Sequence, residues 1–277
     1  MKKPTTLKRA VIAYPSGNTT VIVFDQMLDE DRKDLNKRIM ATWKSKFNDK
    51  PEIEQCCFVT KPRSPEAVAR VEMFGGEFCG NATRSVICLI TGGEDYSGKI
   101  EVSGVDRPLD FESKDRIITL EMPLSQTKNT ELAKKIDEGV LVTLDGITHV
   151  VVTDEQLQDV STPKDKILQL VSENTYGLAD QPAAGVTYYN KTTNKADFAV
   201  WVKEVDTIFD ETACGSGTSS IGIALANEQK DDIIVAVIQP SGESITTSAR
   251  FNPGKGVTLS TISGTVDILY DSRLDLV

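Results

Sequence analysis

Cys79-Gly80-Asn81-Ala82-Thr83-Arg84-Ser85 and Cys214-Gly215-Ser216-Gly217-Thr218-Ser219-Ser220 repeat one pattern at two places in the chain. Cysteine, glycine, threonine and serine recur at the same spacing, Cys-Gly-x-x-Thr-x-Ser. Each copy runs into apolar residues at helical spacing, which predicts a buried helix that begins just after the cysteine. Two copies, one in each half of the chain, indicate a duplicated unit.

The position of the two cysteines gives them a chemical role. A helix N-terminus presents unpaired backbone N–H groups and partial positive charge, so it binds carboxylates and favours a thiolate. We therefore expect the pKa of Cys79 and Cys214 to lie below the free-thiol value of about 8.5. If one thiol is ionised and the other protonated, such a pair can remove a proton from one face of a carbon and return one to the other.

A structural role for these cysteines is the alternative, because cysteine is among the most often buried residues. Packing alone does not require the same pattern at two helix starts, so the repeat favours a functional role for Cys79 and Cys214. The other cysteines lie in a strand-like run (Cys56 and Cys57) or inside a predicted helix (Cys88). We interpret these three as core residues.

The composition excludes several classes of protein. The 277 residues carry 31 Lys and Arg against 41 Asp and Glu, a net charge of −10, which argues against binding to nucleic acid or to a membrane surface. A signal peptide and a membrane span are not recognisable, so we expect a cytoplasmic protein with reduced thiols. His149 is the only histidine and there is no Cys-x-x-Cys pair, so we expect no zinc site. There is also no recognisable nucleotide-binding loop.

The remaining pattern predicts two α+β halves of similar size, residues 1–126 with Cys79 and residues 127–277 with Cys214. In the first half, strands are expected at 10–14, 20–24, 54–60, 67–73, 99–102 and 116–122, and a helix at 29–47. A polar stretch at 124–130 is the best linker candidate. In the second half, strands are expected near 140–152, 185–189 and 197–202, and a helix near 163–173.

The motifs around the two cysteines carry a family resemblance. Gly76-Glu77-Phe78-Cys79-Gly80-Asn81-Ala82-Thr83 and Glu211-Thr212-Ala213-Cys214-Gly215-Ser216-Gly217-Thr218 resemble the two catalytic motifs of the diaminopimelate epimerase-like family. This family comprises cofactor-independent amino-acid racemases and epimerases. Supporting matches elsewhere in the chain are Ser16-Gly17-Asn18, Gln55, Glu121-Met122-Pro123 and Gln239-Pro240-Ser241-Gly242-Glu243.

The resemblance implies a fold and a set of site residues. The fold would have two pseudo-symmetric halves, each a strongly curved, barrel-like mixed or antiparallel sheet around a central helix, with the active site in the cleft between. The last strand would be free to cross back to the N-terminal half. The implied acid/base pair is Cys79 and Cys214, and no cofactor or metal is implied. The implied substrate-binding residues are Gly80, Asn81, Gly215 and Ser216, which would hold the α-carboxylate, and Asn18 and Gln55.

Departures from the family pattern bear on the substrate. Diaminopimelate epimerases carry asparagines where this chain has Met73 and Thr187, an Asn-Pro-His segment at Ile147-Thr148-His149, and a Glu-Arg pair at Val205-Asp206. Without that arginine, the distal carboxylate of diaminopimelate would be left unpaired. The motif spelling looks most like the histidine racemase branch, and the acidic residues Glu72, Asp206 and Asp210 suit a polar or cationic side chain. Histidine is therefore the leading substrate, and we include Asp206 among the predicted substrate-binding residues.

The sequence is also compatible with other functions. Diaminopimelate or another amino acid would be alternative substrates of the same chemistry. A phenazine-biosynthesis-like isomerase shares the fold, but such proteins typically lack the paired cysteines. A protein that binds an amino acid without catalysis, or a thiol redox sensor, would be a non-enzymatic alternative. The expected partner is a small-molecule amino acid, and a homodimer is one possible assembly.

Overall fold

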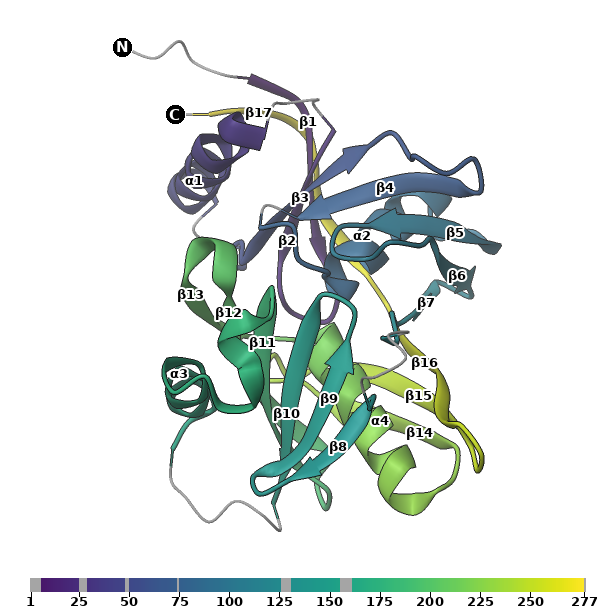
Figure 1. The fold of residues 1–277 in the computed structure, drawn as a ribbon. Coiled ribbons are helices and arrows are strands. Elements are labelled where there is room, and N and C mark those ends of the chain that lie inside the picture. The colour runs from purple at the N-terminus through teal and green to yellow at the C-terminus, as the bar shows by residue number, and fades with distance from the viewer. Residues whose placement is uncertain are drawn as a thin grey trace.

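A computed structural model of the protein describes residues 6–24, 29–47, 50–73, 75–125, 131–154 and 161–276. In this part of the chain, 17 strands form one mixed sheet that is associated with four α-helices and two short 3₁₀ segments. The molecule has two lobes, with α1 and α2 in one and α3 and α4 in the other (Figure 1).

The first lobe is built mainly from the N-terminal part of the chain. Its elements are β1 (Thr6–Tyr14), β2 (Thr20–Val23), α1 (Asp29–Lys46), β3 (Gln55–Thr60), β4 (Ala67–Met73), α2 (Gly80–Thr91), β5 (Tyr96–Val102), β6 (Leu109–Lys114) and β7 (Ile117–Glu121). The final strand, β17 (Asp267–Asp275), returns to this lobe and pairs antiparallel with β1.

The second lobe follows the same alternation of strands and helices. Its elements are β8 (Ala133–Ile136), β9 (Gly139–Leu144), β10 (Ile147–Thr153), α3 (Pro163–Ser172), η1 (Thr175–Asp180), β11 (Ala183–Asn190), β12 (Lys195–Val202), η2 (Lys203–Val205), β13 (Thr207–Glu211), α4 (Gly215–Gln229), β14 (Ile233–Ile238), β15 (Ser244–Asn252) and β16 (Gly256–Gly264).

Each α-helix lies between two strands that pair in parallel. The parallel pairs are β2–β3 around α1, β4–β5 around α2, β10–β11 around α3, and β12–β14 around α4, the last joined by a single bridge. Parallel neighbours need a long crossover connection, which these helices supply. Four crossovers of this kind explain why an otherwise antiparallel sheet is mixed.

The helices occupy two different environments. Almost every residue of α4 and the first two turns of α2 are buried, since strands of their own lobes surround them. By contrast, α1 and α3 each bury one face against the sheet, through apolar clusters that contain Trp43 and Ile167 respectively. The two helices that begin at the cysteine motifs are therefore the central ones.

The sheet continues from one lobe to the other. The pairing of β7 with β16 joins the strands of both lobes, and one large apolar cluster extends through them. The family resemblance implied a separate curved sheet in each half. The structure instead has one sheet, because backbone hydrogen bonds cross between the lobes through β16. The predicted boundary between residues 126 and 127 lies outside the described residues.

Most predicted elements are present, and several strands were not predicted. The predicted strand at 67–73 is β4, and the predicted helix at 163–173 is α3, which begins at the capping box of Thr162 and Asp165. The structure adds β6, β8 and β13 through β17. None of the helices in the described ranges is long and apolar enough to span a membrane.

Candidate active site

A cavity of about 350 Å³ lies where the two lobes meet. Cys79 and Gly80 line it from the first lobe, and Cys214, Gly215 and Ser216 line it from the second. Asn18 and Gln55, the other two residues predicted near the substrate, also line it. The structure therefore brings together seven of the nine residues that the sequence selected.

The two cysteines hold the same position in their helices. Cys79 is the N-cap of α2, with φ −133° and ψ 110°, and Cys214 is the N-cap of α4, with φ −127° and ψ 110°. Each Sγ atom accepts a hydrogen bond of 3.4 Å from the backbone N–H three residues later, that of Ala82 or Gly217. Each thiol is thus aligned with the positive end of a helix.

The glycine after each cysteine allows the two helix starts to approach one side chain. A Cβ atom on Gly80 would lie 2.8 Å from Cδ1 of Ile262, and a Cβ on Gly215 would lie 2.9 Å from the same atom. Ile262 is fully buried in β16, the strand that joins the lobes. Both motifs therefore need glycine at this position for packing as well as for access.

Asparagines connect the two lobes beside the second cysteine. Nδ2 of Asn81 and Nδ2 of Asn18 both donate to the carbonyl of Ala213, at 3.0 and 3.1 Å. Asn81 was predicted to bind substrate, but it is fully buried and its side chain is part of this bridge, outside the cavity lining. The backbone of Cys214 is held from its other side, because its N–H donates to Oε1 of Gln239 at 3.0 Å.

The thiol pKa values move in the opposite direction from the one expected. Burial, followed by the charge of Glu211, raises the pKa of Cys79 to about 12 and raises that of Cys214 further. The helix N–H groups do lower both pKa values, as expected, but their effect is smaller. Both thiols are therefore protonated near neutral pH.

Each thiol has a polar neighbour in addition to its helix. The Cys79 thiol donates to Oε1 of Gln55 at 3.1 Å, and Sγ of Cys214 lies 3.5 Å from Oγ of Ser216.

The hydroxyl of Ser216 also contacts a buried histidine. It lies 2.9 Å from Nε2 of His149, and Nδ1 of His149 lies 3.3 Å from Oγ1 of Thr187. Burial lowers the pKa of His149 to about 3, so the ring is neutral and connects to Cys214 only through Ser216.

Acidic side chains dominate the charge of the cavity. Glu54, Glu77, Asp210 and Glu211 line it, and no Lys, Arg or His is present among the described lining residues. Burial and the neighbouring Glu54 and Glu77 raise the pKa of Glu211 to about 8. The sequence reasoning missed Glu54, Glu77 and Glu211, although the last two stand two and three residues before the cysteines in the quoted motifs.

Asp206 was predicted to bind substrate, and the structure does not bring it into the lining. Its Oδ1 atom accepts a 3.0 Å hydrogen bond from Nε1 of Trp201. The chain turns at Asp206 with φ 45°, and this turn directs the carboxylate back to β12. Of the other acidic residues expected near the site, Glu72 pairs with Arg70, while Asp210 lines the cavity and pairs with Lys164.

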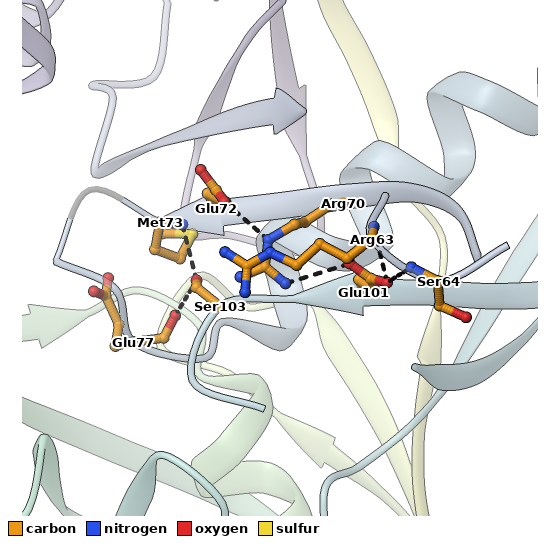
Figure 2. A network of polar contacts seen from close by, with 8 residues as sticks. All are labelled: Arg63, Ser64, Arg70, Glu72, Met73, Glu77, Glu101 and Ser103. Carbon is orange, nitrogen blue, oxygen red and sulfur yellow. Dashed lines mark hydrogen bonds and ion pairs between the residues drawn. The ribbon is translucent and has the colours of Figure 1, made fainter. Parts of the chain in front are cut away.

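A polar network fixes Met73, at the end of β4, and Glu77, two residues before Cys79 (Figure 2). Oγ of Ser103 donates to the carbonyl of Glu77 at 2.6 Å and accepts from the N–H of Met73 at 3.0 Å. Behind it, the buried carboxylate of Glu101 accepts from the backbone N–H groups of Arg63 and Ser64 and from the guanidinium of Arg70. Met73 and Glu77 are therefore both attached to Ser103, the residue that follows β5.

The rest of the lining is largely apolar. It includes Met73, Ile147 and Val205, at the positions where diaminopimelate epimerases were expected to carry polar residues, and Val200 and Phe209 beside them. In the described part of the chain, no three His, Cys, Asp or Glu side chains are close enough together to hold a metal ion.

Residues 10–272 match the family described as "Histidine racemase CntK N-terminal domain". The chain belongs to this family. It is 28% identical over 244 residues to a histidine racemase of Fusobacterium nucleatum, covering 82% of this chain and 84% of the relative. It is 23% identical over 262 residues to a histidine racemase of Staphylococcus aureus, covering 88% and 91%.

Solved structures share the fold. A PhzF-family phenazine biosynthesis protein of Bacillus anthracis has a TM-score of 0.65 and 12% identity, covering 98% of this chain and 99% of that protein. A hydroxyproline epimerase of Agrobacterium vitis has a TM-score of 0.62 and 12% identity, covering 99% and 94%. Membership of the histidine racemase family makes the protein an isomerase, an amino-acid racemase with a small-molecule substrate.

Proposed function

We propose that this racemase interconverts the enantiomers of histidine without a cofactor, with Cys79 and Cys214 as its acid/base pair. The observation that carries the proposal is the matched geometry of the two thiols, which cap two helices and line one cavity. An α-carbon held between them has an acid on one face and a base on the other. The family match and the histidine racemase relatives support histidine as the substrate.

In this proposal, the substrate carboxylate lies on the two helix N-termini. The backbone N–H groups of Gly80, Asn81, Gly215 and Ser216 belong to the first turns of α2 and α4, where N–H groups lack intrahelical acceptors. The α-ammonium group then lies beside Glu211, whose Oε2 already accepts from Asn18 at 2.6 Å. Asn18 thereby orients the carboxylate that receives the ammonium group.

The proton transfer follows from the charges at the site. An ammonium group beside Glu211 favours the ionised carboxylate and offsets its effect on both thiol pKa values, so one thiol can release its proton to solvent and become the thiolate when substrate binds. The thiolate takes the α-proton from one face, and the other thiol donates its proton to the opposite face. After turnover the two cysteines have exchanged protonation states, and the enzyme is ready for the opposite enantiomer.

The site disfavours diaminopimelate as substrate. A distal carboxylate in this cavity would meet four acidic residues, and the described lining contains no basic side chain to pair with it. The apolar residues Met73, Ile147 and Val205 offer no hydrogen bond in its place. A single-headed amino acid fits the charge of the site better.

We also propose that residues 1–126 and 127–277 are two copies of one unit that face each other across the cavity. The equal cap geometry of α2 and α4 and the shared strand–helix–strand crossovers support this duplication. We place the enzyme in the cytoplasm, where the two free thiols would stay reduced. A homodimer remains one candidate assembly.

Serine substitutions test the acid/base pair. We expect Cys79→Ser and Cys214→Ser each to lose histidine racemisation by at least about 100-fold, because a hydroxyl is a far weaker acid than a thiol and does not ionise to act as the base. Chiral chromatography of histidine incubated with each variant measures the loss. Cys88→Ser is the matched control, since Cys88 lies inside α2, away from the cavity lining, and should keep activity. Full activity in either site variant would overturn the mechanism.

A further inference from the structure

Two buried acceptor atoms of the cavity residues have no hydrogen-bond partner among the described residues. They are Oε2 of Glu77 and Oδ1 of Asn36, and both residues line the cavity. An unpaired buried acceptor costs free energy, so native proteins usually satisfy such atoms. Two unpaired acceptors in one binding cavity point to a ligand that brings N–H or O–H donors.

The other three acidic residues of the lining already have partners. Glu54 accepts from the N–H and hydroxyl groups of Thr212, and Glu211 accepts from Asn18. Asp210 pairs with Lys164 at 2.8 Å. Glu77 is therefore the acidic residue of the lining with an unpaired buried oxygen.

The scaffold holds the backbone of Glu77, and the backbone N–H groups of Gly75 and of Glu77 itself bind its carboxylate, but Oε2 is left without a partner. Ser103, directly after β5, fixes the carbonyl of Glu77, and the carboxylate points away from Ser103 (Figure 2). Nearby Arg70 is committed to Glu72 and Glu101, so it supplies no counter-charge. Asn36 reaches the same cavity from a different element, α1. Burial raises the pKa of Glu77, as expected for a carboxyl group without a paired cation.

We propose that Glu77 and Asn36 form the subsite for the substrate side chain, and that this subsite selects a ring with N–H donors. The inference rests on the proposed function, which uses the helix N-termini for the carboxylate and Glu211 for the ammonium group. Only the side chain of the substrate remains to be placed, and only Glu77 and Asn36 remain unpaired. A protonated imidazole has two N–H donors, one for each acceptor.

The apolar lining fits the same assignment. Met73 and Phe209 belong to the lining that also contains Glu77. A ring that presents apolar faces and polar edges needs both kinds of surface, as most small-molecule sites provide. A neutral aromatic side chain would fill the volume but leave the carboxylate of Glu77 unpaired, which is the stronger basis for discrimination.

Glu77→Gln and Asn36→Leu test the subsite, with Glu228→Gln as a matched control at an exposed position. Substrates are L-histidine, its two ring-N-methyl derivatives and L-2-thienylalanine, an aromatic analogue without ring N–H groups. For Glu77→Gln we expect KM for histidine to rise about tenfold or more with a smaller change in kcat. The preference of the wild type for histidine over thienylalanine should fall by a similar factor. Asn36→Leu should shift the same ratio less, because it removes a neutral acceptor.

The outcomes separate the subsite from the overall reaction. Wild-type racemisation of histidine with an unchanged preference in both variants would overturn the subsite and leave the proposed function standing. A wild type that racemises no amino acid would overturn both. Thermal unfolding of each variant identifies a loss of fold, and the preference ratio is measured within one variant, so a uniform loss of active protein cannot produce the expected shift.

Discussion

At the scale of single residues, the site sets opposing effects on the same thiols. Each Sγ accepts a hydrogen bond from a backbone N–H group, which lowers the thiol pKa. Burial and Glu211 raise the thiol pKa, and burial has the largest effect of the three. A helix N-terminus alone would give a reactive thiolate in the free protein. Here burial keeps the thiols protonated and Glu211 adds to the pKa shift, so the proposed mechanism couples thiol reactivity to a substrate ammonium group that offsets Glu211.

Glu211→Gln tests this coupling in the free enzyme. Removing the charge should lower the pKa of both thiols, so alkylation by iodoacetamide above pH 8 should be faster, by about tenfold for each unit of pKa. The size of this difference depends on pH, because the pKa of Glu211 is about 8: below that pH the wild-type carboxyl is mostly neutral and the difference should vanish. Alkylation rates from pH 7 to 10 measure it, with Glu228→Gln as control. Equal or slower alkylation of Glu211→Gln at pH 9 would contradict the account.

At the scale of elements, the parallel pair β10–β11 supports the second cysteine. His149 of β10 is paired in register with Gly185 of β11, and Thr187 lies two residues along the same strand. The absence of a side chain at Gly185 makes room for the imidazole ring, which a Cβ there would overlap. The ring of His149 can therefore occupy the space above Gly185 and contact Ser216, which lies beside Cys214.

Gly185→Ala tests this support. The added Cβ must displace the ring of His149, so we expect a loss of about 2 kcal/mol in the free energy of unfolding, typical of overpacking a filled core. The contact from His149 to Ser216 should be lost as well, and kcat should fall while KM changes less. Urea unfolding and steady-state kinetics measure the two effects. Gly254→Ala, at an exposed turn with a nearest contact of 3.6 Å, is the control. Wild-type stability and kcat in Gly185→Ala would show that the ring is not constrained.

Sequence periodicity predicted elements well where burial dominates. β4 alternates buried and more exposed residues and has the predicted bounds, 67–73. β6 alternates as clearly, with Leu109, Phe111 and Ser113 buried, but its exposed positions carry charged residues, which are depleted in strands. Strands such as β6 form because their neighbours pair with them, and that information is not local to the segment.

At the scale of the whole molecule, the repeat was informative because each Cys-Gly motif determines its own helix cap locally. The motif therefore predicts two equivalent helix caps, at Cys79 and Cys214, without any information about contacts between the lobes. Asn36 and the chain from His149 to Ser216 could not be predicted this way, because they join segments far apart in the sequence. Asp206, which was expected near the substrate, is directed to Trp201 by a local turn.

The central claim is that two thiols, one from each lobe, act on opposite faces of one carbon. The most direct measurement is the early fate of deuterium when L-histidine is racemised in D₂O without added cofactor. Two separate bases predict that the D-histidine formed carries deuterium at the α-carbon, while the L-histidine recovered at low conversion remains unlabelled. D-histidine without deuterium, or label that enters the recovered L-histidine as fast as D-histidine forms, would indicate a single base and contradict the account.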